Sequence, residues 1–247
     1  KKVSVLIPLY NCEKYISEAI DSVLKQTYPN IEVIIVDDES KDNSLHIAKK
    51  YESEKVKVFT QPHSGAPRAR NFAFEVSTGY YIQYLDADDI LAPNKIEEQV
   101  AILENNGNDS MAFCSYTSDI HDFNTGIYLE QGINKDYDAP IELFIDIFNA
   151  KGNIITLCWL TPRALIENSD PWDERLIKAQ DGEFFVKMAL KCQGIFFSNS
   201  TTVYYRPSNS GRITTNHTSK AIESVILSTE SVQNNILKLE NSNRTRQ

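Results

Sequence analysis

The chain has 247 residues, of which 41% are hydrophobic, 10% aromatic and 24% charged, as expected of a globular protein with a well-filled core. Its 34 acidic residues outnumber its 25 lysines and arginines, and the net charge of −9 offers no basic field to attract a nucleic-acid backbone. The four cysteines are far apart and form no C-x-x-C pair, so they are interpreted as reduced packing residues rather than as a disulfide framework or a zinc site. No apolar run approaches the roughly 18 to 20 residues of a membrane span.

The first half of the chain alternates between short apolar runs and segments with helical periodicity. The run Ile31–Val36 is almost continuously apolar and rich in β-branched residues, which is typical of a strand that is covered on both faces. The alternation predicts a mostly parallel sheet with right-handed crossovers and flanking helices. The predicted strands are Val3–Pro8, Ile31–Val36, Val56–Phe59 and Tyr80–Leu85, and the predicted helices are Glu13–Gln26, Ser44–Lys50, Pro67–Val76 and one that Pro93 opens.

After Met111 the alternation becomes less regular. A strand is predicted at 111–116, and half of a hairpin at 125–129. The remaining predicted elements are helices at 141–148 and 181–191, short strands at 195–197 and 202–205, and a long amphipathic helix at 219–239.

Two acidic clusters follow two of the predicted strands. The pair Asp37-Asp38 ends the strand at 31–36, and the cluster Asp86-Ala87-Asp88-Asp89 ends the strand at 80–85. Ligands in open α/β sheets bind beyond the carboxyl ends of the strands, so both clusters would face one crevice if the two strands are neighbours in one parallel sheet. A divalent cation offsets the repulsion between carboxylates, because Mg²⁺ and Mn²⁺ prefer hard oxygen ligands. A nucleoside diphosphate bridged by such a cation suits this edge. The simpler alternative is that these aspartates lie in surface turns, where aspartate is common because it caps the backbone.

Other nucleotide signatures are absent from the sequence. It contains no G-x-x-x-x-G-K-[ST] loop and no G-x-G-x-x-G after the first strand, where the turn is Leu9-Tyr10-Asn11-Cys12. A calcium loop also fits poorly, because Asp86 and Asp88 have its first spacing but no glycine turn follows. The acidic clusters are therefore the main functional signal.

Four segments in order resemble the family 2 glycosyltransferases of the GT-A fold. They are VSVLIPLYN (3–11), VDDES (36–40), GAPRARN (65–71) and YLDADD (84–89), and the resemblance continues weakly to residue 181. It implies an α/β protein with a Rossmann-like, mostly parallel central sheet flanked by helices, and a less regular acceptor-side C-terminal part. Residues 1–110 would be the nucleotide-sugar-binding half of a single GT-A domain, 111–215 the acceptor-binding and catalytic-base half, and 216–247 a C-terminal helical extension.

The resemblance also implies roles for single residues. Asp38 would accept a hydrogen bond from the nucleotide base, and Asp86 would contact the ribose or a water molecule beside it. Asp88 would coordinate Mn²⁺ or Mg²⁺ between the two phosphates, whereas Asp89 would orient the loop or cap the next helix. For Arg70, capping of its own helix or pairing with the first acidic pair is an equal alternative. The donor-binding residues implied in this way are Pro8, Tyr10, Asp38, Arg70 and Asp86.

Asp181 matches the catalytic base of the family, at the start of a predicted helix. Relatives often carry Glu before this Asp, where this chain has Gln180, and Glu183 is the alternative base. Relatives also often carry His shortly after a Tyr-Arg pair, but the pair at 205–206 is followed here by Pro, Ser and Asn. The positions that stay open for a second metal ligand are Ser208 and His217.

The implied reaction is a metal-dependent, inverting transfer of a sugar from a nucleotide-diphosphate donor, with a UDP-sugar as the family default, to an acceptor hydroxyl. The acceptor would be a saccharide, a lipid-linked saccharide or a protein, in the synthesis of surface polysaccharide or another glycan. Trp172 is the aromatic residue for which stacking on an acceptor sugar stays open beside core packing. The alternatives are a nucleotidyltransferase, which would normally show a Gly-rich basic loop after the first strand, and a non-catalytic sugar-nucleotide-binding module.

The sequence also suggests where such a protein would work. The chain begins with a strand rather than a signal peptide, and its cysteines suit a reducing compartment, so a cytoplasmic location is expected. The predicted helix at 219–239 suggests peripheral association with the cytoplasmic face of a membrane, or a homodimer, as alternatives to packing against the core.

Overall fold

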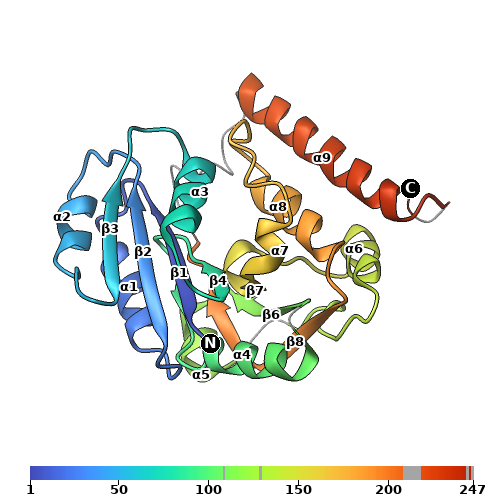
Figure 1. Ribbon diagram of the computed structural model, residues 1–247, viewed down its shortest axis with the longest axis horizontal. Coiled ribbons are helices and arrows are strands. Elements are labelled where there is room, and N and C mark those ends of the chain that lie inside the picture. The colour runs from blue at the N-terminus through green and yellow to red at the C-terminus, as the bar shows by residue number, and fades with distance from the viewer. Residues whose placement is uncertain (108, 128–129, 208–217, 243–244, 246–247) are drawn as a thin grey trace.

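The computed structural model describes residues 1–107, 109–127, 130–207, 218–242 and 245. Its larger sheet contains β1 (Val3–Leu9), β2 (Ile31–Asp37), β3 (Val56–Thr60), β4 (Tyr81–Tyr84) and β7 (Thr161–Pro162). The strand order is β3-β2-β1-β4-β7; the first four strands are parallel, and β7 is an antiparallel edge strand (Figure 1). This confirms the predicted α/β class with a mostly parallel central sheet.

Helices cover both faces of this sheet, namely α1 (Ile16–Leu24), α2 (Ser44–Lys49), α3 (Ala66–Val76) and α4 (Lys95–Asn106) (Figure 1). Alternate side chains of the central strands bury opposite faces. Leu6 and Ile34 share a cluster with α3, whereas Ile7 and Ile35 share a cluster with α1 and α2. Every residue of β1 is buried, which is why this strand is an unbroken apolar run rather than an alternating one.

A smaller sheet contains β5 (Ile90–Leu91), β6 (Ser110–Thr117) and β8 (Gly194–Tyr204), in the order β5-β8-β6. The sequence predicts two short strands where the structure has the single strand β8. Ser198 pairs with Cys114 of β6, but the next residue of β6, Ser115, pairs with Thr202. Residues 199–201 are thereby left out of the register, and this irregularity interrupts the pattern from which two strands are predicted.

The hairpin strand predicted at 125–129 is wrong for the residues that the structure describes. Ile120–Thr125 form the short helix α5, whose N-cap Asp119 accepts two backbone N–H groups of the first turn. Gly126 ends this helix in the left-handed conformation, and 128–129 lie outside the described residues. Further elements without a sequence prediction are β5, β7, the 3₁₀ helix Thr156–Cys158 and α7 (Arg163–Glu167), all too short to carry a periodicity.

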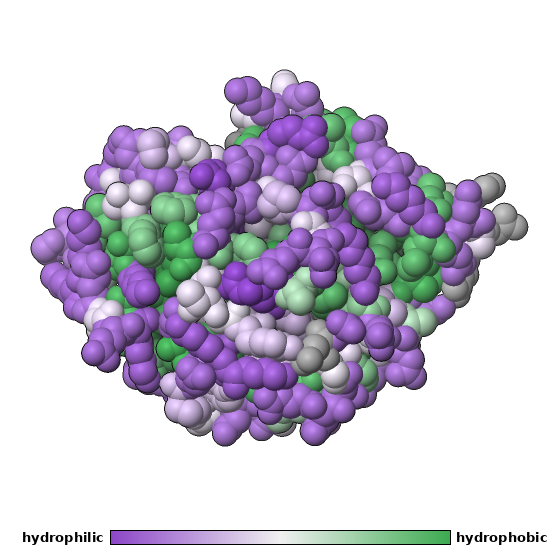
Figure 2. All heavy atoms as spheres, in the orientation of Figure 1, coloured by the Kyte–Doolittle hydropathy of each residue, from purple (hydrophilic) through white to green (hydrophobic). Residues whose placement is uncertain are grey.

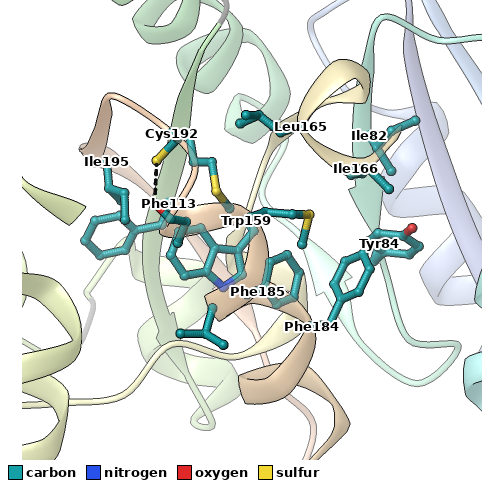
Figure 3. Close-up of a cluster of buried hydrophobic side chains, with 14 of the residues drawn as sticks. Ile82, Tyr84, Phe113, Trp159, Leu165, Ile166, Phe184, Phe185, Cys192 and Ile195 are labelled. Carbon is teal, nitrogen blue, oxygen red and sulfur yellow. Dashed lines mark hydrogen bonds between the residues drawn. The ribbon is translucent and has the colours of Figure 1, made fainter. Parts of the chain in front are cut away.

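One hydrophobic cluster joins the two halves of the chain. Figure 3 shows Tyr84 of β4 beside Phe184 of α8 (Gln180–Ala189), and their rings meet edge to face with centroids 5.5 Å apart. Trp159 stacks on Phe185 of the same helix at 5.2 Å. Because large aromatic side chains contribute most to packing energy, this cluster holds α8 firmly against the larger sheet.

The helix predicted at 219–239 is present as α9 (Ser219–Leu239) with the same bounds. It lies across α8, and the chain ends beyond it (Figure 1). Together with α6 (Pro140–Phe148) it borders an apolar pocket of about 430 Å³, where Figure 2 shows hydrophobic side chains at the surface. None of the helices in the described part of the chain is long and apolar enough to cross a membrane. Membrane association or dimerisation through α9 stays a prediction.

We expect Gly79→Ala to destabilise the fold. A Cβ atom at this position would lie 2.4 Å from the backbone nitrogen and from the Oγ of Ser4, and the buried strand β1 cannot move away. The Gly79 N–H also donates to Ser4 Oγ at 2.7 Å. Overpacking of this kind costs about 1–3 kcal/mol, which urea denaturation would detect. Gly182→Ala is the control, since in the described part of the chain no atom beyond its two neighbours and its own helix backbone lies within 4 Å of the added carbon. Unchanged stability of the Gly79 variant would contradict the prediction.

Candidate active site

The two acidic clusters lie at the same edge of the larger sheet. β1 lies between β2 and β4, so the carboxyl ends of these three parallel strands are adjacent. The Asp38 N–H donates to the Leu9 carbonyl at 2.8 Å, and the Leu85 N–H donates to the Leu6 carbonyl at 3.0 Å. The chain therefore leaves β2 and β4 on either side of β1, and the acidic residues flank the position where ligands of open α/β sheets bind.

The turn after β1 is held by the turn after β2. Asn11 has a left-handed backbone with φ of 49°; its side-chain oxygen accepts the Lys41 N–H at 2.7 Å, and its own N–H donates to Ser40 Oγ at 3.0 Å. Pro8 is buried inside β1, whereas Tyr10 is 41% exposed. Of these two predicted donor-binding residues, only Tyr10 offers an exposed ring to a ligand.

Asp38 holds the loop formed by residues 61–65. Its buried carboxylate accepts two backbone N–H groups of this loop, both at 2.9 Å, and the Gln61 amide at 2.7 Å. His63 Nδ1 lies 2.9 Å from the same carboxylate, and the His63 ring stacks on Tyr10 with centroids 4.4 Å apart. Both Asp38 oxygens thus have protein partners, so a hydrogen bond from a nucleotide base, which stays a prediction, would have to share one of them.

Arg70 joins the acid loop, residues 86–89, to the helix that carries Asp181. Its Nη2 donates to Asp86 Oδ1 at 2.7 Å, and its Nη1 donates to Gln180 Oε1 at 2.9 Å. The guanidinium lies 4.5 Å from the centre of the Trp172 ring, and the side chain is only 7% exposed. One buried cation therefore connects α3, the acid loop and the first turn of α8. The sequence-based alternative of pairing with Asp37 or Asp38 is not the arrangement found.

A second arginine holds the other end of the acid loop. Arg206 follows β8; its backbone N–H donates to Asp89 Oδ1 at 2.9 Å, and its Nε donates to the Asp88 carbonyl at 2.8 Å. Asp89 is 1% exposed and orients the loop, but it does not cap α4, which begins only at Lys95. Asp86 and Asp88 remain partly exposed at the edge of the sheet.

The acid loop makes this edge electronegative. Burial, followed by the Asp88 and Asp86 carboxylates, raises the pKa of the nearby Cys12 thiol to about 12. Within the described ranges, no three His, Cys, Asp or Glu side chains converge on a ready-made metal site. Mg²⁺ usually keeps several waters and is held by one or two carboxylates together with substrate phosphates, so the partly exposed Asp88 fits that manner of binding.

Asp181 lies in the first turn of α8 and is half-buried. Its Oδ1 accepts the Gly182 N–H at 3.0 Å. Burial raises the pKa of Asp181, the Arg70 guanidinium offsets part of this rise, and the Asp86 carboxylate adds to it. The implied base and the acid loop are therefore close enough to influence each other, and a carboxyl that ionises less readily is a better proton acceptor.

Glu183, the alternative base, faces α9. Its Oε2 lies 3.0 Å from Lys187 Nζ, and its Oε1 accepts the hydroxyl of Ser231 at 2.9 Å. Both members of the ion pair are buried. The carboxylate of Glu183 is thus engaged in a pair that is costly to break, and the geometry favours Asp181.

Trp172 is a core residue rather than an exposed platform for a sugar. It is 2% exposed, and its ring stacks on Phe184 with centroids 3.9 Å apart, beneath the Arg70 guanidinium. The sequence-based alternative that Trp172 stacks on an acceptor sugar is wrong, because the side chain is buried. Ser208 and His217, the positions left open for a second metal ligand, lie outside the described residues.

Two residues of the site have no role predicted from the sequence. No sequence pattern predicts a role for His63, because its partner Asp38 lies 25 positions earlier in the chain. Arg206 belongs to the Tyr-Arg pair directly after a predicted strand, and its bonds to the acid loop join residues that are 117 and 118 positions apart.

Comparison with known proteins identifies the family. A sequence profile described as glycosyl transferase family 2 matches residues 4–167, which include both acidic clusters and Arg70. The chain belongs to glycosyl transferase family 2. Asp181 and α9 lie beyond the part that matches the family profile.

Relatives within the family are longer than this chain. An uncharacterised glycosyltransferase of Rickettsia typhi is 34% identical over 209 residues, which are 83% of this chain and 63% of that protein. WfgD of Escherichia coli, a UDP-Glc:alpha-D-GlcNAc-diphosphoundecaprenol beta-1,3-glucosyltransferase, is 40% identical over 115 residues, which are 46% of this chain and 45% of that protein. The alignments thus span less than two thirds of either relative.

The fold agrees with that of a solved structure. The crystal structure of S. aureus TarS residues 1–349 matches with a TM-score of 0.78 at 24% sequence identity, covering 98% of this chain and 67% of that one. The TarS complex with UDP-GlcNAc matches with a TM-score of 0.80 at 23% identity. At this level of identity the likeness shows the fold, and the predicted GT-A fold is confirmed.

Proposed function

We propose that the chain is a metal-dependent, inverting glycosyltransferase that moves a sugar from a UDP-sugar to the hydroxyl of an acceptor. The observation that carries this proposal is the pair of bonds from Arg70 to Asp86 and to Gln180, because they bring the acid loop and the turn that contains Asp181 to one site. Membership of glycosyl transferase family 2 supports the class of reaction.

The names of similar proteins support the choice of substrates. WfgD uses UDP-Glc, and TarS forms a complex with UDP-GlcNAc, so a UDP-sugar is the proposed donor. The acceptor of WfgD is a lipid-linked GlcNAc, which supports a saccharide or lipid-linked saccharide over a protein as acceptor here. We also propose a role in the synthesis of surface polysaccharide, which a lipid-linked saccharide acceptor would suit.

The donor nucleotide would lie beyond the end of β1. The exposed ring of Tyr10 offers a stacking surface for the base, and the Asp86 side chain, which is 36% exposed, can accept a ribose hydroxyl. Asp88 would hold Mn²⁺ or Mg²⁺ beside the two phosphates. The bound ion would neutralise the charge that develops on the leaving diphosphate.

Asp181 would act as the general base. As the acceptor oxygen forms a bond to the anomeric carbon, the bond from that carbon to the β-phosphate oxygen breaks, and its electron pair leaves with the nucleoside diphosphate. The proton of the acceptor hydroxyl passes to Asp181 during the attack. Attack from the face opposite the leaving group inverts the configuration of the sugar. Arg70, bonded to the neighbouring Gln180, would hold the base in line with the donor.

A panel of ligands tests this proposal. Melting temperatures would be measured with UDP-glucose, UDP-GlcNAc, GDP-mannose and ATP, each with and without Mn²⁺, because a ligand that binds only the folded state raises the melting temperature. We expect a rise with a UDP-sugar in the presence of Mn²⁺, together with slow release of UDP. Release of pyrophosphate from a nucleoside triphosphate would instead indicate a nucleotidyltransferase, and binding without turnover at high protein concentration would indicate a binding module.

The pH dependence of turnover follows from the environment of Asp181. Its pKa is raised chiefly by burial, and a base must be ionised to accept a proton. Turnover should therefore be lost as the pH falls through this raised pKa, at a higher pH than an exposed aspartate would require. Steady-state UDP release measured across the acid range checks this, and an acid limb at the ordinary aspartate value of about 4 would contradict it.

A further inference from the structure

Three serines of α9 form a row that faces the segment entering α8. Ser224, Ser228 and Ser231 are spaced by four and three positions, so they share one side of the helix. Ser224 is 2% exposed and Ser228 is 4% exposed, whereas helix positions such as Thr229 are exposed. Buried hydroxyl groups normally have hydrogen-bond partners, and here every partner lies on or just before α8.

Ser224 and Ser228 bond to three consecutive residues of the backbone. The Oγ of Ser224 accepts the N–H groups of Ile177 at 3.0 Å and Lys178 at 2.9 Å, and donates to the Lys178 carbonyl at 2.8 Å. The Oγ of Ser228 donates to the Ala179 carbonyl at 2.7 Å. Residues 177–179 are thus fixed from outside immediately before Gln180 and Asp181.

The backbone that these serines hold is strained. Ala179 has φ of 57° and ψ of 35°, a left-handed conformation that residues with a Cβ atom rarely adopt. Such a conformation persists only where the surroundings determine it, and the Ser228 hydroxyl supplies a bond at this residue. The direction in which the chain leaves Ala179 sets where the first turn of α8 points its side chains.

The third serine extends the same contact along α8. Ser231 donates to Glu183 Oε1 at 2.9 Å, so α9 holds both the entry to α8 and its first turn. α9 lies across α8 over this region (Figure 1). The side of α8 that faces α9 carries Glu183, whereas Gln180 bonds to Arg70, which in turn bonds to the acid loop.

We propose that Ser224 and Ser228 of α9 are positioning residues, which fix the backbone at 177–179 and thereby place the Asp181 carboxylate for proton transfer. This proposal rests on the proposed role of Asp181 as the base. It gives the C-terminal helix a part in the reaction, although α9 supplies no group that touches the substrate. If the two serines had a purely structural role, their substitution would lower stability without a separate effect on turnover.

The test is the double variant Ser224→Ala/Ser228→Ala, compared with Thr229→Ala as the matched control. Thr229 lies on the same helix and is exposed, and among the described residues its hydroxyl bonds only to the Val225 carbonyl of its own helix. With UDP-glucose and UDP-GlcNAc as probes and Mn²⁺ present, UDP release gives kcat and donor KM. We expect kcat to fall by about tenfold to a hundredfold in the double variant, since small misplacements of catalytic groups have effects of this size, with donor KM unchanged.

A second measurement separates positioning from general damage. Deuterium exchange of backbone amides should become faster at 177–183 and stay unchanged in β1 and β4 of the double variant. If the double variant does not fold, Ser228→Ala alone takes its place, with the same expectation. A folded variant that keeps the kcat of the parent, or exchange that rises equally throughout the molecule, would overturn the proposal.

Asp181→Asn measured in parallel separates the two proposals. If this variant keeps its turnover, the assignment of the base is wrong, and the positioning role falls with it. If Asp181→Asn loses turnover and the serine variant does not, the base stands and only the positioning role is wrong.

Discussion

Asp181→Asn should nearly abolish sugar transfer while leaving donor binding intact. Asparagine has the size of aspartate but cannot accept the proton of the acceptor hydroxyl, and removing a general base costs roughly 10²- to 10⁴-fold in rate. The new side chain can still accept the Gly182 N–H through its carbonyl oxygen, so the start of α8 should remain in place. The groups predicted to hold the donor lie on or directly after β1, directly after β2, on α3 and in the acid loop, none of which the substitution changes.

The measurement combines UDP release in the steady state with calorimetry of UDP in the presence of Mn²⁺. We expect kcat to fall by the factor given above and the dissociation constant of UDP to stay close to that of the parent. A fall in UDP affinity as large as the fall in kcat would show that Asp181 supports donor binding rather than proton transfer.

Glu183→Gln is the matched control, because it neutralises a carboxylate of the same helix. The amide can keep the bond from Ser231, but the buried Lys187 loses its charged partner, so a lower melting temperature is expected. Turnover per folded molecule should nevertheless stay near that of the parent. The reverse pattern, with Glu183→Gln inactive and Asp181→Asn active, would assign the base to Glu183.

Local patterns predicted the elements that form the edge of the larger sheet. The apolar runs of β1 and β2 are unbroken because both faces of these strands are buried, and this feature is visible in the sequence itself. Asp37-Asp38 lie at the end of β2 and the acid loop follows β4, and parallel strands of one sheet place both clusters at the same edge. That β1 separates them is a matter of strand order, which the alternating pattern does not determine.

The parts that could not be predicted depend on contacts between distant residues. Arg70 meets Gln180 across 110 positions, and the Ser224 hydroxyl meets Lys178 across 46. Serine and glutamine are common surface residues, so their presence in a helical pattern indicates nothing about a buried partner. For a related reason the sequence predicts two strands in place of β8, because an irregularity in strand register has no sequence pattern of its own.

Asp88→Ala should remove the dependence of nucleotide binding on the metal ion. Asp88 is partly exposed at the edge of the sheet, whereas Asp89 is buried in the same loop. An ion beside the diphosphate would therefore lose its principal protein ligand. Mutation of even an outer-sphere partner at a metal site typically costs roughly 10- to 100-fold in metal affinity. We therefore expect the gain in UDP affinity on adding Mn²⁺ to fall by at least this factor.

Calorimetry of UDP with and without Mn²⁺ measures this gain, and Glu39→Gln is the control. Glu39 also follows β2 at the same edge, but its side chain is 53% exposed and pairs with Lys41. If the acidic residues at this edge of the sheet acted only through their summed negative charge, the two variants would weaken the metal effect alike, since each removes one charge from the edge. A site built around Asp88 predicts that Glu39→Gln keeps the metal effect and Asp88→Ala loses it. An unchanged metal effect in Asp88→Ala would place the ion elsewhere.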